Sequence, residues 1–279
     1  MRLSWISAIF VLAAGVFFAS APTARASLML EVSQANFDFG GGLHEMIFVD
    51  NNVGIAPPAP ADPDNDADSE VTGIDFNPLV GSLQLGLTQN TPVVVGGITV
   101  TGSVHTSNSP GTPLAGGIAQ LASQAFVIQN NTAASVTQKV IVGDTGYMFP
   151  TGGLSSWVFQ ISGNITGGVT IRNRAWDDSS NKQFGGADGH TDGTAQLLFD
   201  DTETSTFNKT LTGTSFVGPG PYAKTIEFDI TLAPGASLTL RNDQLQNTGV
   251  PEPATLVGAG FAAVALAVFG LRRRASKVA

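Results

Sequence analysis

Residues 226–232, Ile-Glu-Phe-Asp-Ile-Thr-Leu, alternate apolar and polar side chains without a break. A strand with this period of two buries one face and exposes the other. Residues 233–236, Ala-Pro-Gly-Ala, place proline and glycine at the two central positions of a type II turn. Residues 237–240, Ser-Leu-Thr-Leu, then alternate again. The whole stretch predicts a β-hairpin.

Similar short segments recur outward from this stretch, joined by connections rich in Gly, Asn and Thr. We expect strands at residues 29–32, 93–100, 124–129, 138–142, 157–161, 169–172 and 196–199, and one short helix at 116–124. Strands at this spacing predict an all-β fold. The expected body is an antiparallel β-sandwich, of the jelly-roll or immunoglobulin-like kind.

The N-terminus has the features of an export signal. Arg2 precedes an apolar run over residues 6–18, and Ala24-Arg25-Ala26 then forms an A-x-A cleavage pattern. A helix of this length is too short to span a bilayer core of about 30 Å. Residues 1–26 are therefore predicted to be a signal peptide that is removed from the mature protein.

The C-terminus has three parts in a fixed order. A Pro-Glu-Pro motif is followed by an uncharged apolar stretch over residues 254–271 and then by three consecutive arginines. The stretch is just long enough to cross a membrane as a helix, and clustered arginines beside a spanning helix stay in the cytoplasm. We expect a transmembrane helix at 254–271 with a basic tail at 272–277. The body, residues 27–249, would then lie outside the cytoplasmic membrane.

This tail resembles the PEP-CTERM sorting signal of Gram-negative bacteria that produce exopolysaccharide. The resemblance covers residues 250–274, and the sorting residues are Pro251, Glu252, Pro253, Arg272, Arg273 and Arg274. It implies recognition and processing by an exosortase, a membrane-embedded enzyme. It also implies that the mature body ends at the cell surface or in the extracellular matrix, in association with biofilm.

The composition of the body restricts its chemistry. The chain has 13 Lys+Arg and 22 Asp+Glu, and removal of six basic and one acidic residue with the two ends leaves a net charge of −14. Such an acidic surface repels phosphate backbones, which argues against nucleic-acid binding. The chain has no cysteine, so it forms neither disulfides nor thiolate metal sites.

An acidic segment is the best candidate for a metal site. Residues 56–70 are rich in proline and aspartate, which predicts a long exposed loop. Acidic side chains fall at every second position of its last part, and Ca²⁺ accepts several oxygens in flexible geometry. The segment lacks the glycine and the final glutamate of an EF-hand loop, so a solvated loop without a cation is the alternative. The candidate calcium ligands are Asp62, Asp64, Asp66, Asp68 and Glu70.

A polar, glycine-rich segment over residues 177–193 is the second candidate. Within it, His190 lies between two aspartates and could ligate a metal, or could simply be exposed and idle. Trp176 borders the segment and could stack on a sugar ring, whereas Trp157 lies in an alternating segment and is expected in the core. The three histidines, His44, His105 and His190, occur in no recognisable catalytic motif, and no catalytic residue is predicted.

Together these features predict an exported, non-enzymatic envelope or matrix protein that an exosortase processes and that associates with exopolysaccharide. Two alternatives remain open at this point. The first is a calcium-dependent carbohydrate-binding module, with Ca²⁺ as its cofactor. The second is a secreted glycan-active enzyme, because paired carboxylates meet in space rather than in sequence.

Overall fold

The computed structural model describes residues 28–34, 43–50, 69–72, 74–75, 82–86, 93–95, 97–101, 104–112, 117–150, 152–187 and 194–249. The predicted signal peptide, the sorting anchor and residues 56–68 of the acidic loop lie outside these ranges. In the described ranges every regular element is a β-strand. None of these ranges contains a helix with the length and apolar character that a membrane span requires.

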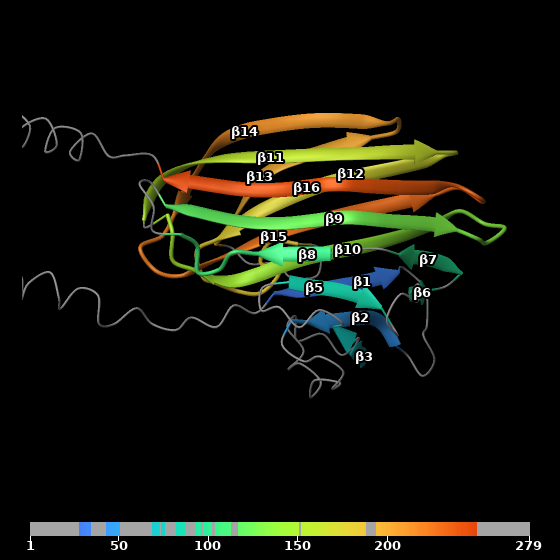
Figure 1. Ribbon diagram of the computed structural model, residues 1–279, viewed down its shortest axis with the longest axis horizontal. Helices are drawn as coiled ribbons and strands as arrows, with labels where there is room; N and C mark the ends of the chain where they lie inside the picture. The colour runs from blue at the N-terminus through green and yellow to red at the C-terminus, as the bar shows by residue number, and fades with distance from the viewer. Residues whose placement is uncertain are drawn as a thin grey trace, which may run out of the picture.

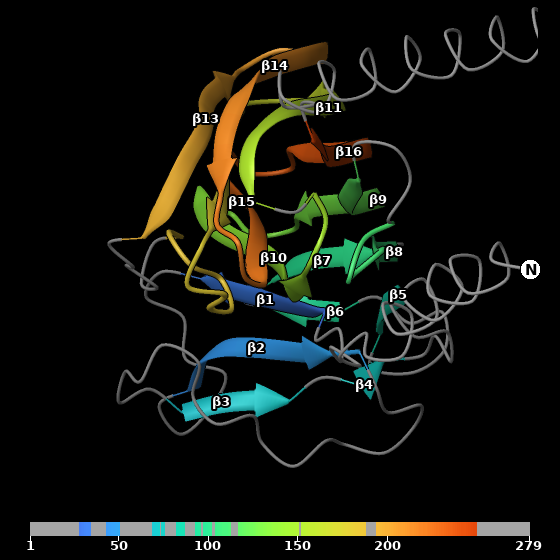
Figure 2. The same cartoon turned by 90° about the vertical axis from the view of Figure 1, so that its left-hand side faces the viewer.

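The strands form two sheets that face each other (Figures 1 and 2). The seven-stranded sheet has the order β13 (Ala195–Glu203), β12 (Val169–Asp178), β15 (Tyr222–Leu232), β10 (Val136–Tyr147), β1 (Met29–Gln34), β2 (Leu43–Val49) and β3 (Ser69–Thr72). The nine-stranded sheet runs β14 (Phe207–Val217), β11 (Gly153–Thr166), β16 (Ser237–Gly249), β9 (Ile118–Asn130), β8 (Val104–Ser107), β5 (Ser82–Gly86) and β4 (Ile74–Asp75), and a hairpin of β6 (Val93–Val95) and β7 (Ile98–Thr101) joins it at β9. Among the described pairs only β2 with β3 is parallel. The prediction of an all-β sandwich built from antiparallel sheets is therefore confirmed.

The predicted hairpin at residues 226–240 is wrong, although both of its strands exist. β15 pairs with β10 and β12, whereas β16 pairs with β11 and β9 in the other sheet. The connection between them therefore crosses from one sheet to the other. The predicted turn itself is present, because Ala236 donates its N–H to Ala233 O at 3.0 Å and Gly235 has a φ of 71°.

Asn130, at the end of β9, holds this crossing in place. Its side-chain amide donates to Leu232 O at 3.0 Å and to Ala134 O at 2.8 Å. Its backbone carbonyl accepts the N–H of Gly235, and its backbone N–H donates to Ala236 O, both at 3.0 Å. Buried carbonyl groups without hydrogen-bond partners would be costly. Asn130 supplies these partners at the point where the chain passes from one sheet to the other.

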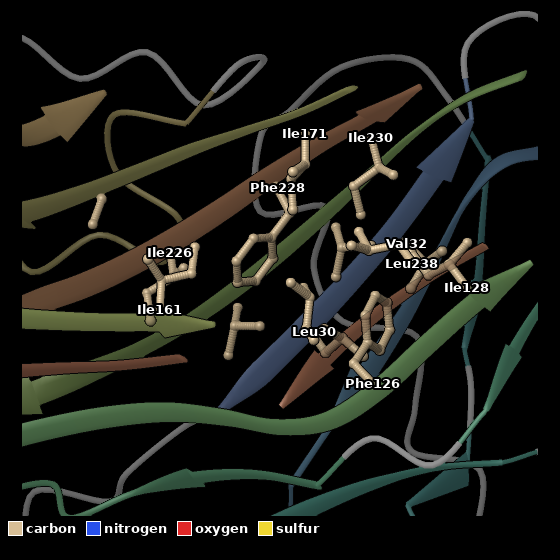
Figure 3. Packing of buried hydrophobic residues seen from close by; sticks show 14 of the residues in the cluster. Leu30, Val32, Phe126, Ile128, Ile161, Ile171, Ile226, Phe228, Ile230 and Leu238 are labelled. Carbon is tan, nitrogen blue, oxygen red and sulfur yellow. The ribbon is translucent and has the colours of Figure 1, made fainter. Parts of the chain in front are cut away.

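The main core lies between the two sheets. This core includes Ile226 and Phe228 of β15, Phe126 of β9 and Leu238 of β16, all four fully buried (Figure 3). Trp157 belongs to the same cluster with 6% of its surface exposed, which confirms its expected core position. Burial of apolar surface is the main stabilising contribution in such a fold.

The other expected strands lie within β1, β9, β10, β11, β12 and β13 and are confirmed, with two corrections. The helix expected at 116–124 is wrong, because the residues from Ile118 onward belong to β9 and bury Ala119 and Leu121 on one face. Pairing with β16 therefore overrides the moderate helix propensity of this segment. Residues 93–100 form two paired strands rather than one, with a turn at Gly97.

Candidate functional site

Most of the predicted metal and sorting residues lie outside the part of the chain that the structure describes. This holds for Asp62, Asp64, Asp66, Asp68, His190 and all six sorting residues, while Glu70 belongs to β3. Within the described ranges no group of three or more His, Asp or Glu is placed to hold a metal ion. The calcium site in the acidic loop therefore stays a prediction.

Trp176 does not form the open platform that a sugar-stacking residue needs. It is 5% exposed and belongs to a small second core on the outer face of the seven-stranded sheet, together with Phe184 and Ile141. Residues 179–187, which follow β12, fold over this face. Phe184 packs so closely on Gly143 that a Cβ there would lie 2.7 Å from the Phe184 ring. Ligand binding at Trp176 would require this segment to leave the face.

Asp178 keeps the covering segment in place. Its carboxylate accepts hydrogen bonds from the backbone N–H groups of Ser180 and Lys182, both at 2.9 Å, and from Thr194 Oγ1 at 2.5 Å. Its neighbour Asp177 points the other way, into the sandwich, since successive strand residues face opposite sides. The two adjacent aspartates therefore do not act as one metal-binding pair.

The outer face of the seven-stranded sheet also carries paired charges. Arg174 donates to Glu227 Oε1 and to Asp229 Oδ2, both at 2.6 Å. Arg172 forms a two-pronged pair with Asp200 at 2.7 and 2.5 Å, and this hydrogen bonding raises the pKa of Arg172. These charged side chains therefore pair with one another.

The outer face of the nine-stranded sheet has a different chemistry. On β11, buried Ser155, Trp157 and Phe159 alternate with more exposed residues, and β14 and β16 follow the same period. The strand register aligns the outward residues in rows across β14, β11, β16 and β9. The rows are Phe216–Leu154, Thr214–Ser156–Thr248–Ile118, Thr212–Val158–Gln246–Gln120 and Thr210–Gln160–Gln244. We call these residues the Gln/Thr face.

The Gln/Thr face contains no ionisable residue, although the body around it is strongly acidic. Its four strands lie side by side in Figure 1, and at about 4.8 Å per strand they span about 14 Å. Gln and Thr side chains both donate and accept hydrogen bonds. Gln244 Nε2 donates to Gln246 Oε1 at 3.4 Å, which aligns two of the amides along β16.

One end of the Gln/Thr face is apolar. Phe216 is 64% exposed and its cross-strand neighbour Leu154 is 54% exposed. The backbone N–H of Phe216 donates to Gln196 Oε1 of β13 at 3.1 Å, which ties this end of β14 to the other sheet. An exposed aromatic side chain on a strand whose backbone is held in place is suited to contact a ligand. This face could not be recognised from the sequence. The inward positions of β14 include Gly213 and Ser215 in place of large apolar residues, so the segment shows no clear apolar–polar alternation.

No known family model matches this chain, and no curated protein matches it. Among solved structures it is similar to TmCBM61 in complex with β-1,4-galactotriose, at 10% identity and a TM-score of 0.26 over 54% of this chain and 88% of that one. It is also similar to the C-terminal family 22 carbohydrate-binding module of Clostridium thermocellum Xyn10B, at 12% identity and a TM-score of 0.27 over 57% and 91%.

Proposed function

We propose that the body is a non-enzymatic glycan-binding module that acts outside the cytoplasm and binds neutral polysaccharide through the Gln/Thr face. The observation that carries the proposal is an uncharged array of donors and acceptors with an exposed aromatic ring at one end. Sugar hydroxyls donate and accept hydrogen bonds, so they match amide and hydroxyl side chains. Neither partner has to desolvate a charge, which would be costly.

The Phe216 ring supplies the apolar part of this surface. A sugar ring presents C–H groups on its faces, and these can lie on an aromatic side chain while the hydroxyls reach neighbouring polar groups. Thr214 and Ser156 lie in the row next to Phe216 and Leu154. This arrangement supports the carbohydrate-binding alternative better than a purely structural role.

The location rests on the two ends of the sequence. The signal peptide and the PEP-CTERM-like tail support export, exosortase processing and delivery to the cell surface or matrix, where exopolysaccharide would be the ligand. Protease added to spheroplasts should then degrade the body while cytoplasmic markers survive. A body that resists protease under conditions that remove periplasmic markers would contradict export.

The binding proposal is tested by affinity electrophoresis of the detergent-solubilised full chain in gels that contain xylan, galactan or dextran, with alginate as the anionic comparison. We expect retardation by at least one neutral polymer. Phe216→Ala should weaken binding roughly tenfold, which corresponds to about 1.4 kcal/mol. Arg172→Ala, on the opposite outer face, is the matched control and should bind like the unmodified chain.

The same gels separate the alternatives. Retardation by alginate alone, or equal losses in Phe216→Ala and Arg172→Ala, would contradict the Gln/Thr face as the binding surface. Binding that disappears with a chelator and returns with Ca²⁺ would instead favour the calcium-dependent module, with the acidic loop as the cation site. Polymer shortened during the run would point to a glycan-active enzyme.

A further inference from the structure

Near one end of the sandwich, a polar cluster is buried between the sheets. Lys224 of β15 and Asp177 of β12 are cross-strand neighbours in the seven-stranded sheet, and Asn247 of β16 reaches them from the nine-stranded sheet. Lys224 and Asn247 are 0% exposed and Asp177 is 3% exposed. Ser155 and Ser215 complete the cluster. A lysine enclosed in this way is rare, because its charge is costly to bury.

The three groups contact one another in a closed triangle. Lys224 Nζ lies 2.6 Å from Asn247 Oδ1 and 2.9 Å from Asp177 Oδ1. Asn247 Nδ2 donates to Asp177 Oδ2 at 2.5 Å. The amide orientation follows from the partners, since an ammonium group can only donate and a carboxylate can only accept. One oxygen of Asp177 thus faces the lysine nitrogen and the other faces the amide nitrogen.

The surroundings of Lys224 exclude water, which makes its charged form costly. Burial lowers the pKa of Lys224, and Asp177 opposes this effect only in part. The rings of Tyr147 and Tyr222 lie 6.0 and 5.8 Å from Nζ, and both residues are buried. In a low-dielectric site the proton can pass from the ammonium to the carboxylate, which leaves an amine and a carboxylic acid. A desolvated neutral amine is a nucleophile.

We propose that Lys224 and Asn247 react to form an amide cross-link between the two sheets, with Asp177 relaying the protons. The target of attack is Cγ of Asn247. Because a C=O bond is about 1.2 Å long and Nζ lies 2.6 Å from Oδ1, Cγ is at most about 3.8 Å from Nζ. The fold thus holds Nζ and Cγ close enough to react without a diffusional encounter, which raises the rate of the reaction.

The atoms balance without an oxidant or any other co-reactant. The lone pair of neutral Nζ forms a bond to Cγ, and the C=O electrons move to Oδ1. Asp177 delivers a proton to Nδ2 and accepts one from Nζ as the intermediate collapses. The Cγ–Nδ2 bond breaks, ammonia leaves, and the C=O bond reforms. The product is an amide joining Nζ to Cγ, and Asp177 is regenerated. The cross-link would form whether or not the Gln/Thr face binds glycans.

The test is peptide mass spectrometry of the folded full chain after denaturation and digestion with trypsin. We expect the peptides that contain Lys224 and Asn247 to appear joined, lighter than their sum by the mass of one ammonia, with no cleavage after Lys224. Lys224→Arg, which keeps a positive charge but lacks a primary amine, should give only separate peptides. Lys209→Arg is the matched control, because Lys209 pairs with the carboxylates of Asp201 and Glu203 on the surface, and it should leave the cross-link unchanged.

Separate peptides from the folded unmodified chain, with normal cleavage after Lys224, would overturn the proposal without any variant. A cross-link from Lys224 to the peptide that contains Asp177, with loss of water, would overturn Asn247 as the acyl donor. Asp177→Asn tests the proton relay, because an amide cannot exchange protons as a carboxyl group does. Folded Asp177→Asn should accumulate the cross-link at least tenfold more slowly, and an unchanged rate would remove Asp177 from the mechanism.

Discussion

Asp177→Ala is expected to lower the free energy of unfolding by about 3–5 kcal/mol relative to unmodified chain in which the cross-link has not yet formed, which is the range for removing one partner of a buried ion pair. The substitution leaves Lys224, which is fully buried, without its carboxylate partner. It also removes the acceptor for Ser215 Oγ and for Asn247 Nδ2. Chemical denaturation followed by circular dichroism measures the loss.

Two comparisons isolate the buried charge as the cause. Adding Lys224→Met to Asp177→Ala removes the unpaired ammonium and should recover most of the lost stability. Asp201→Ala breaks a Lys–Asp pair at the surface, where Lys209 is 40% exposed, and should cost at most about 1 kcal/mol. A cost for Asp177→Ala as small as that for Asp201→Ala would mean that Lys224 is solvated in solution.

Phe228→Ala is expected to cost about 3–5 kcal/mol, because it removes a fully buried ring from the centre of the core. Phe228 points from β15 into the core between the two sheets, so removal of its ring leaves a cavity there (Figure 3). The same denaturation measurement applies.

The matched control for Phe228→Ala is the same substitution at Phe216. That ring is 64% exposed, so its removal should change stability by no more than about 0.5 kcal/mol. The two substitutions therefore also distinguish folding from function, since Phe216→Ala should weaken glycan binding without a loss of stability. Equal destabilisation by the two substitutions would contradict the assignment of Phe228 to the core.

The strand pattern of the body could be predicted, but the connection between sheets could not. Residues 226–232 and 237–240 each bury one face, and this holds equally for a hairpin in one sheet and for strands in two facing sheets. The difference depends on Asn130, which lies far away in sequence and binds the connecting turn. Local periodicity carries no information about such a partner.

The candidate sites were harder to predict, because their residues meet only in space. The Gln/Thr face depends on β14, whose inward positions include Gly213, which leaves room for the Trp157 ring and hides the alternation. In the buried cluster, Asp177, Lys224 and Asn247 come from three strands in two sheets. The sequence predicts that Asp177 begins a polar loop. In the structure it is the penultimate residue of β12 and faces inward.

The position of Asn247 has a mechanical consequence. β16 ends at Gly249, and any pull on a body tethered through its C-terminus enters at this point. β16 is flanked by β11 and β9, so tension on its last residues first strains hydrogen bonds to these neighbours. Asn247 also couples this point to Lys224 in the facing layer, so that the load is shared between both halves of the sandwich. When a body bound to a polymer is under shear, β16 would therefore resist separation from the sandwich at its C-terminal end.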